Sequence, residues 1–274
     1  MNNIAPSSHP AISEDVHADI MRRLRQAEKD HEVRILLAVE SGSRAWGFAS
    51  DNSDYDVRFI YVHQPRWYQT VDLEDRRNVI EYPIVDEIDL NGWDIRKALK
   101  LFWKSNPAFM EWIQSPICYI QNGAFRDNAI AAVPEMYSVI DGIYHYRSMA
   151  KKTECTFLRG EDVLLKKYFY ALRPLLAVRW LERYGIPAPI EFDKMLHLIE
   201  DCPDLLADVK ALLSQKRNMP ELGRGPRVPS IDEFVLSELS RLAKLNLDAQ
   251  LDPKDITPLN AIFHLALDEM SSTL

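Results

Sequence analysis

The first half of the chain alternates between helical and strand patterns. Residues 13–29 place apolar side chains at helical spacing, and Ser13 stands where a residue that caps the helix is expected. A second helix is expected from Asp94 to about Asn106. Runs rich in apolar and β-branched residues predict buried strands over 33–39, 55–62, 78–83 and 84–90, the last two of which could also form one bent strand.

Helical patterning dominates from Pro107 onward. Helices are expected over 108–114, 136–157, 161–184, 191–200, 203–217, 231–246 and 258–270. Residues 218–230 contain three prolines and two glycines and predict a loop. No alternating strand pattern is found after residue 120. The sequence therefore predicts a sheet-containing domain over 1–120 and a helical domain over 121–274.

Composition narrows the class of protein. The chain has 274 residues and a net charge of −8, which does not suit a general nucleic-acid binder but leaves room for a local basic patch. Its three cysteines are far apart in sequence, so we expect reduced thiols in a cytoplasmic protein. The first residues lack the pattern of a signal peptide, and no apolar run is long enough to predict a membrane span.

The segment from Gly42 to Asp56 holds residues suited to phosphate and metal chemistry. Gly42 lets the backbone approach a phosphate closely, and Ser43 adds a hydroxyl donor beside it. Asp54 and Asp56 stand two residues apart at the start of a predicted strand, so their side chains are expected on one face. Two carboxylates on one face repel each other, and a divalent cation with oxygen ligands removes that penalty.

A third carboxylate is expected from the strand at 84–90. Glu87 and Asp89 share one face of that strand, and Asp89 is preferred over Glu87 as the further metal ligand. Three carboxylates that hold two metal ions suit in-line displacement at phosphorus, and Asp89 could also act as the general base. Arg58 follows Asp56 by two residues and either steers the substrate or neutralises the carboxylates. The pattern leaves both roles open.

Other charged and aromatic residues add weaker signals. Arg44 is expected to donate to a phosphate, the alternative being an ion pair with Asp51. Trp46 and Phe48 could stack on a base, although local packing is preferred. Six basic residues in the helical half form either a patch that holds the triphosphate or an RNA backbone, or two solvated helix faces. These residues are Arg147, Lys151, Lys152, Lys166, Lys167 and Arg173.

These motifs resemble a known family. G-S followed by D-x-D, with a lone carboxylate on a later strand, is similar to nucleotidyltransferases of the polymerase-β superfamily. Over roughly residues 33–185 the chain resembles the bacterial and phage RNA-repair, ligase-associated polymerase-β-like nucleotidyltransferases, in the blocks GSRAWGFASDNSDYDVRFIYV, IDLNGWDIRKALKLFWKSNPAFMEWIQSP, HYRSMA and KKYFYALRPLLAVRW. The resemblance implies an α+β fold, with a small mixed polymerase-β-type sheet flanked by helices and an all-helical C-terminal domain.

The resemblance also implies an activity and its residues. A nucleoside monophosphate would pass from an NTP, with ATP favoured, to an acceptor hydroxyl, and pyrophosphate would leave. Two Mg²⁺ ions are implied, with Mn²⁺ as the alternative. The residues expected to be catalytic and to bind metal are Asp54, Asp56 and Asp89. The residues expected to bind the nucleotide are Gly42, Ser43, Arg44, Lys151, Lys167 and Tyr170.

The acceptor is left open. An RNA 3′ end is favoured on the resemblance alone, although the net charge of −8 tilts slightly against a long nucleic acid. The alternatives are a protein side chain that becomes AMPylated, a small molecule such as an antibiotic, and a regulator that binds NTP without turnover. No membrane association is expected, and the sequence names no protein partner.

Overall fold

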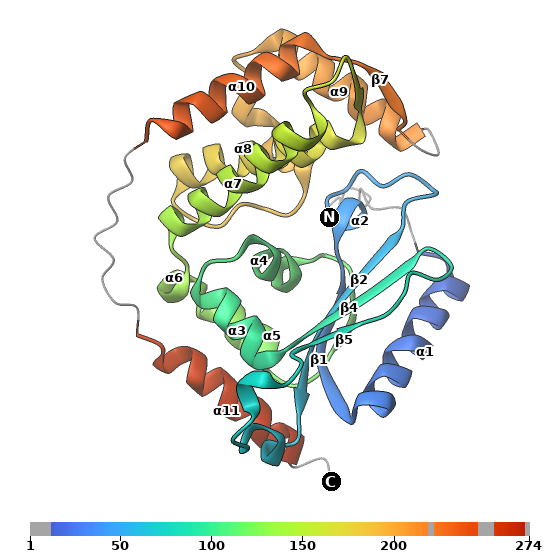
Figure 1. Cartoon of the computed structure of the whole chain (residues 1–274), viewed down its shortest axis with the longest axis vertical. Coiled ribbons are helices and arrows are strands. Elements are labelled where there is room, and N and C mark those ends of the chain that lie inside the picture. The colour runs from blue at the N-terminus through green and yellow to red at the C-terminus, as the bar shows by residue number, and fades with distance from the viewer. Residues whose placement is uncertain (1–11, 219–221, 246–254, 272–274) are drawn as a thin grey trace, which may run out of the picture. The chain divides into compact units, whose positions relative to one another are not determined.

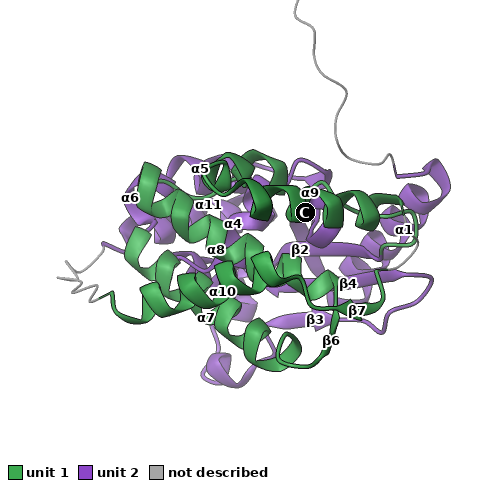
Figure 2. Cartoon of the chain, turned by 90° about the horizontal axis from the view of Figure 1, so that it is seen from above, with its two compact units in different colours: residues 1–10, 46–53, 138–251 green, residues 11–45, 54–137, 252–274 purple. Residues whose placement is uncertain are grey.

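A computed structural model describes residues 12–218, 222–245 and 255–271, which belong to two compact units (Figures 1 and 2). The first, here called the sheet unit, contains the described residues 12–45, 54–137 and 255–271. The second, here called the helical unit, contains residues 46–53, 138–218 and 222–245. Each unit is described separately below.

The sheet unit is built on five strands in the order β3-β4-β2-β1-β5. Strand β2 pairs parallel with β4, whereas the other pairs are antiparallel. The sheet is therefore mixed, and the predicted α+β class is confirmed. The strands are β1 (Val33–Glu40), β2 (Tyr55–His63), β3 (Val79–Glu81), β4 (Ile88–Asp94) and β5 (Cys118–Gln121).

Side-chain caps fix the starts of two helices in this unit. Ser13 accepts a hydrogen bond from the backbone N–H of Val16 and caps α1, and Asp94 accepts one from Arg96 and caps α3, as the sequence predicts. Two short 3₁₀ helices, η1 (Pro65–Tyr68) and η2 (Leu73–Asp75), follow β2. The α-helices are α1 (Glu14–His31), α2 (Gly42–Ala45), α3 (Ile95–Trp103), α4 (Pro107–Gln114), α5 (Phe125–Ala131), α6 (Val133–Met136) and α11 (Thr257–Ser271).

Both faces of the sheet carry a hydrophobic core. On one face, Val57 and Phe59 of β2 and Leu90 of β4 pack with the buried side of α1. On the other face, Ile60 and Val62 of β2 pack with α3, α4, α5 and α11. Because neighbouring residues of a strand alternate between faces, Asp56 and Arg58 continue the face of Ile60 and Val62. They stand at the end where β2 begins.

The predicted strand over 84–90 is wrong in its first half. Asp86 and Glu87 adopt left-handed backbone conformations, with φ of 54° and 63°, and form a turn before β4 begins at Ile88. A residue in this conformation cannot continue the strand alternation, so Glu87 does not share a strand face with Asp89. The Glu87 side chain is exposed on that turn.

The helical unit is centred on two long helices, α7 and α8, that pack against each other. It also contains a small antiparallel sheet formed by β6 (Asp162–Leu164) and β7 (Arg224–Pro226). The prediction of an all-helical C-terminal domain misses this pair, because three-residue strands leave no periodic signal. The remaining elements are α7 (Val139–Phe157), α8 (Lys166–Tyr184), η3 (Phe192–Ile199), α9 (Pro203–Asn218) and α10 (Pro229–Ala243).

The units do not follow the predicted boundary between residues 120 and 121. Residues 46–53 pack in the helical unit, where the Phe48 ring contacts the rings of Phe169 and Phe192. Helix α11 belongs to the sheet unit, because Leu259 and Ile262 join the core beneath α3 and α5. Each unit therefore draws on separate stretches of the chain, which local sequence patterns do not reveal.

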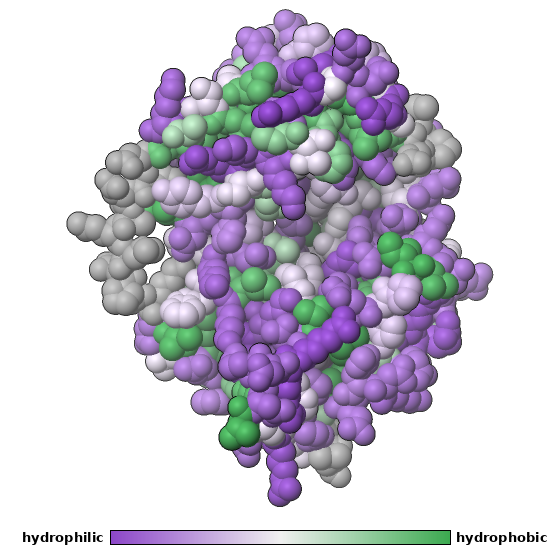
Figure 3. Space-filling view, viewed as in Figure 1, coloured by the Kyte–Doolittle hydropathy of each residue, from purple (hydrophilic) through white to green (hydrophobic). Residues whose placement is uncertain are grey.

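The face shown in Figure 3 is mostly hydrophilic, with apolar groups in small patches. Within the described ranges, no helix combines the length and the apolar composition that a bilayer-spanning segment needs.

We expect His63 to make stability depend on pH. Its ring stacks on Trp67 with centroids 3.9 Å apart, and burial lowers its pKa to about 4, with help from His31 and Arg76. Between pH 6.5 and 4 the unfolded chain binds the proton more readily than the folded one, so the free energy of unfolding falls as pH falls. Since His63 is only partly buried, we expect a loss of about 1–2 kcal/mol.

Urea unfolding at pH 7.0 and at pH 4.5 measures this effect. The His63→Gln variant, which does not titrate, should lose less stability than the wild type between the two pH values. Equal losses in both proteins would contradict the assignment to His63.

Candidate active site

Two of the predicted carboxylates lie side by side on neighbouring strands. In the parallel pairing of β2 with β4, Asp56 is the direct partner of Asp89. The backbone N–H of Tyr55 donates to the carbonyl of Glu87 at 2.7 Å and holds this register at the strand ends. Both carboxylates are partly buried, with 28% of each side chain exposed. The structure thus brings together two oxygen-bearing groups that stand 33 residues apart in sequence.

Arg58 forms ion pairs with both of these carboxylates. Its Nη2 lies 2.8 Å from Oδ1 of Asp56 and 2.7 Å from Oδ2 of Asp89. Its Nη1 donates to the backbone carbonyls of Val57 and Asp89, at 3.1 Å and 2.8 Å. Of the two roles that the sequence left open for Arg58, neutralisation of the carboxylates is the one that these contacts support.

Gly42 brings the backbone directly against Asp56. It has a φ of 58°, and a Cβ atom at this position would lie 2.0 Å from Oδ2 of Asp56. The preceding residue, Ser41, donates its N–H to the carbonyl of Asp56 at 2.9 Å. A side chain at position 42 would therefore collide with the carboxylate, which explains why glycine is needed at the start of α2.

A buried glutamate, Glu40, hydrogen-bonds the backbone of Asp56 and was not singled out from the sequence. Glu40 is fully buried at the end of β1, and its two carboxylate oxygens accept hydrogen bonds from the N–H of Asp56 at 2.9 Å and the hydroxyl of Tyr119 at 2.5 Å. Ser115 donates to the carbonyl of Glu40 at 2.6 Å. The one available signal is a charged residue that closes the apolar run VRILLAVE.

Burial and nearby charges shift the pKa values at this edge. Burial raises the pKa of Glu40 to about 7, although the hydrogen bonds from Tyr119 and Asp56 oppose the shift. Burial also raises the pKa of Asp56; the Arg58 guanidinium opposes this, and the negative charges of Asp89 and Asp54 add to it. The edge therefore resists further negative charge and favours a positive partner.

The other predicted residues of the sheet unit lie close by in sequence. Asp54 is exposed and directly precedes β2. Its backbone carbonyl accepts a hydrogen bond from Nε of Arg44 at 3.4 Å. The Arg44 guanidinium lies over the ring of Tyr55, 3.9 Å from its centroid, and the side chain is almost fully buried. Ser43 is partly buried in the first turn of α2.

The predicted nucleotide contacts at Lys151, Lys167 and Tyr170 belong to the helical unit. Lys167 Nζ lies 4.5 Å from the centroid of the Tyr170 ring, and burial lowers the pKa of this lysine. Tyr170 also packs against Trp46, with ring centroids 5.3 Å apart. Lys151 is exposed on α7. Trp46 and Phe48 are packing residues in this unit, as the preferred interpretation holds. A nucleotide role for Lys151, Lys167 and Tyr170 stays a prediction.

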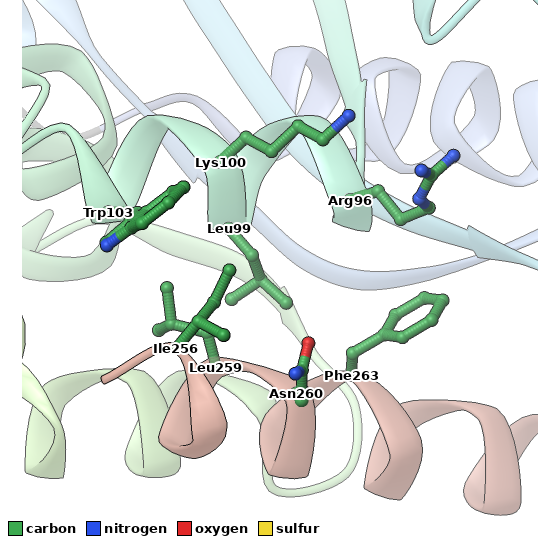
Figure 4. A pocket seen from close by; sticks show the side chains of 8 residues that line it. All are labelled: Arg96, Leu99, Lys100, Trp103, Ile256, Leu259, Asn260 and Phe263. Carbon is green, nitrogen blue, oxygen red and sulfur yellow. The ribbon is translucent and has the colours of Figure 1, made fainter. Parts of the chain in front are cut away.

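Two cavities of the sheet unit lie away from the carboxylates. One, of about 200 Å³, lies between α3 and α11 and is shown in Figure 4. There Leu99 points toward Leu259, while Arg96 and Lys100 form ion pairs with Glu74 outside the cavity. The other, of about 460 Å³, is lined by His63 and Trp67, where β2 ends. Neither is lined by an aspartate of the predicted site.

The residues at the start of β2 and β4 fit a divalent cation. Asp56 and Asp89 offer hard oxygen donors, which Mg²⁺ prefers, and Mg²⁺ often takes only one or two carboxylates and completes its shell with water and phosphate. In the part of the chain that the structure describes, no three acidic, histidine or cysteine side chains form a ready-made metal cluster. Metal binding by Asp54, Asp56 and Asp89 therefore stays a prediction.

Comparison with known proteins identifies the family. A profile described as "RNA repair pathway DNA polymerase beta family" matches residues 16–265. The chain belongs to this family. The family resemblance that the sequence motifs indicated is thereby confirmed. Members of the family are polymerase-β-like nucleotidyltransferases.

The chain is similar to one curated relative and to one solved structure. The chain is 40% identical over 238 residues to the uncharacterized protein YcgL of Bacillus subtilis (strain 168), covering 87% of this chain and 91% of that protein. It is also similar to a nucleotidyltransferase-like protein from Exiguobacterium sibiricum 255-15, at 10% identity and a TM-score of 0.32, over 93% of this chain and 91% of the other. A TM-score this low supports no inference.

We expect Gly42→Ala to be destabilising through Asp56. The left-handed backbone conformation alone costs an alanine about 1 kcal/mol, and the contact with the carboxylate adds to this cost. In an Asp56→Ala background the carboxylate is removed and only the Cβ of residue 56 remains, at 3.3 Å, so Gly42→Ala should cost less there.

A double-mutant cycle measured by urea unfolding tests this coupling. We expect a coupling free energy of about 1 kcal/mol or more between the two positions. Gly185→Ala is the matched control, since Gly185 also has a left-handed backbone, with φ of 67°, and nothing lies within 4 Å of a Cβ there. Strictly additive effects of Gly42→Ala and Asp56→Ala would show that the close approach has no energetic weight.

Proposed function

We propose that this protein transfers a nucleoside monophosphate from an NTP to an acceptor hydroxyl and releases pyrophosphate. The observation that carries the proposal is the direct pairing of Asp56 with Asp89 beside the tight turn at Gly42. Membership of a polymerase-β-like nucleotidyltransferase family supports the same reaction class. Asp54, whose charge acts on Asp56, completes the proposed carboxylate set.

Each predicted site residue of the sheet unit has a distinct role in the proposed reaction. Asp56 and Asp89, with Asp54, would hold Mg²⁺, which would make the acceptor hydroxyl more acidic and stabilise the charge that develops on pyrophosphate. Gly42 lets the backbone approach the triphosphate, and Ser43 donates its hydroxyl to it. The acceptor oxygen forms a bond to the α-phosphorus while the bond from that phosphorus to pyrophosphate breaks. Asp89 accepts the acceptor's proton.

We infer that the acceptor is an RNA 3′ hydroxyl. The description of the family as one of an RNA repair pathway supports this choice. A row of basic residues on α7 and α8, which suits phosphate contacts, also supports it: Arg147, Lys151, Lys152, Lys166 and Lys167. The net charge of −8 weighs against a long nucleic acid and keeps a protein or small-molecule hydroxyl as the alternative.

Pyrophosphate release with each of the four NTPs and Mg²⁺, with and without cellular RNA, tests the reaction and its acceptor. RNA-dependent release would support transfer to RNA and identify the nucleotide, for which ATP is our first choice. NTP binding by calorimetry without release under any condition would instead favour a regulator.

We predict that Asp56→Asn and Asp89→Asn each lower turnover at least 100-fold, because each removes a charged metal ligand while keeping the side-chain shape. A factor of 100 corresponds to about 2.7 kcal/mol of transition-state stabilisation. The matched control is Glu87→Gln, on the exposed turn two residues before Asp89, which should keep turnover within about two-fold.

The pyrophosphate assay on purified, folded variants tests the metal site and decides between Asp89 and Glu87 as a metal ligand. More than about a tenth of wild-type turnover in Asp56→Asn or Asp89→Asn would refute the proposed metal site. A large loss of turnover in Glu87→Gln, with a small loss in Asp89→Asn, would assign the metal-ligand role to Glu87 instead of Asp89.

A further inference from the structure

Arg58 is held between the two candidate metal ligands by four contacts. One nitrogen, Nη2, bridges a carboxylate oxygen of Asp56 and one of Asp89, at 2.8 Å and 2.7 Å. The other, Nη1, is anchored on two backbone carbonyls at 3.1 Å and 2.8 Å. Only 18% of the side chain is exposed. The guanidinium therefore occupies a defined position on this face of the sheet.

A divalent cation on the same two oxygens would lie very close to this nitrogen. Mg²⁺ binds oxygen at about 2.1 Å. An ion at that distance from Oδ1 of Asp56 could be no farther than about 5 Å from Nη2 of Arg58, which lies 2.8 Å from the same oxygen. Positive charges at such a separation, on a partly buried face, repel strongly. The ion pairs of Arg58 and a bridging cation thus compete for the same carboxylates.

We propose that Arg58 is the built-in counter-ion of the Asp56–Asp89 pair and that a divalent cation binds this pair by displacing the guanidinium. The inference rests on the proposed function, since that function assigns the metal to these aspartates. It adds that Arg58 sets the metal concentration at which the site fills. In the metal-free protein, Arg58 removes the repulsion that two paired carboxylates would otherwise suffer.

Arg44, the other arginine near these carboxylates, does not act as the counter-ion of the Asp56–Asp89 pair. The guanidinium of Arg44 packs on the ring of Tyr55, 3.9 Å from its centroid, and its Nε donates to the backbone carbonyl of Asp54. Arg58, by contrast, forms ion pairs with both Asp56 and Asp89. Loss of its charge should therefore change the affinity of the pair for cations more than any change at Arg44.

The chain contains a matched control for Arg58. Arg23 on α1 also bridges two aspartates through one nitrogen, with Nη2 2.7 Å from Asp19 and 2.8 Å from Asp86. Its Nη1 donates to the carbonyl of Val85 at 2.9 Å, and 17% of its side chain is exposed. Arg23→Gln thus removes an equivalent ion-pair arrangement away from the Asp56–Asp89 pair.

Mn²⁺ binding, followed by electron paramagnetic resonance of the free ion in the absence of NTP, tests the inference without relying on turnover. Arg58→Gln should bind Mn²⁺ at least ten-fold more tightly than the wild type, whereas Arg23→Gln should match the wild type. Arg58→Lys, whose ammonium cannot make all four contacts at once, should lie between them and serves if Arg58→Gln does not fold. Asp56→Asn should abolish binding in every background.

The outcomes separate this inference from the proposed function. Wild-type Mn²⁺ binding that depends on Asp56, with Arg58→Gln and Arg58→Lys no tighter than wild type, would overturn the counter-ion role and leave the proposed metal site standing. Failure of the wild type, Arg58→Gln and Arg58→Lys alike to bind Mn²⁺ at Asp56 would overturn both. Tighter binding in Arg23→Gln as well would show a general charge effect and would also overturn the inference.

Discussion

The parallel pairing of β2 with β4 is the contact on which the candidate site depends. It places Asp56 opposite Asp89, and a shift of one residue in register would turn one of them to the other face of the sheet. Hydrophobic cores on both faces resist such a shift, since Val57 and Leu90 are buried on one face and Ile60 and Val62 on the other. Burial of apolar side chains along the strands thus fixes the positions of polar groups at their ends.

Paired carboxylates at a strand end are costly, and the surrounding residues limit the cost. Arg58 offsets the repulsion between Asp56 and Asp89. Beneath them, burial raises the pKa of the Glu40 carboxyl to about 7, so near neutral pH it ionises less readily and adds less negative charge than an exposed glutamate would. The close approach of Gly42 limits where the Asp56 carboxylate can move. The site is thus built to hold negative groups close together, which is also the requirement for holding a cation.

Much of this arrangement could be predicted from local sequence. The caps at Ser13 and Asp94 and the strands over 33–39 and 55–62 follow from residue type and periodicity, and all are found in the structure. The expectation that Glu87 shares a strand face with Asp89 rested on a strand that starts too early. The structure places only Asp89 in a strand, because the left-handed turn at Asp86 and Glu87 intervenes. Glu40 was missed because its importance depends on Tyr119 and on Asp56, which are distant in sequence.

The division of the chain into units could not be predicted, because it depends on contacts between distant segments. After Ala45 the chain leaves the sheet unit for eight residues and returns at Asp54. Within those residues, Ser50 and Ser53 accept hydrogen bonds from the buried ammonium of Lys216, at 3.0 Å and 3.3 Å. The G-S and D-x-D parts of the motif are therefore joined by a segment whose own conformation is stabilised by α9, more than 160 residues later. A fragment that ended before α7 would keep every predicted carboxylate but would leave this joining segment without its packing partners.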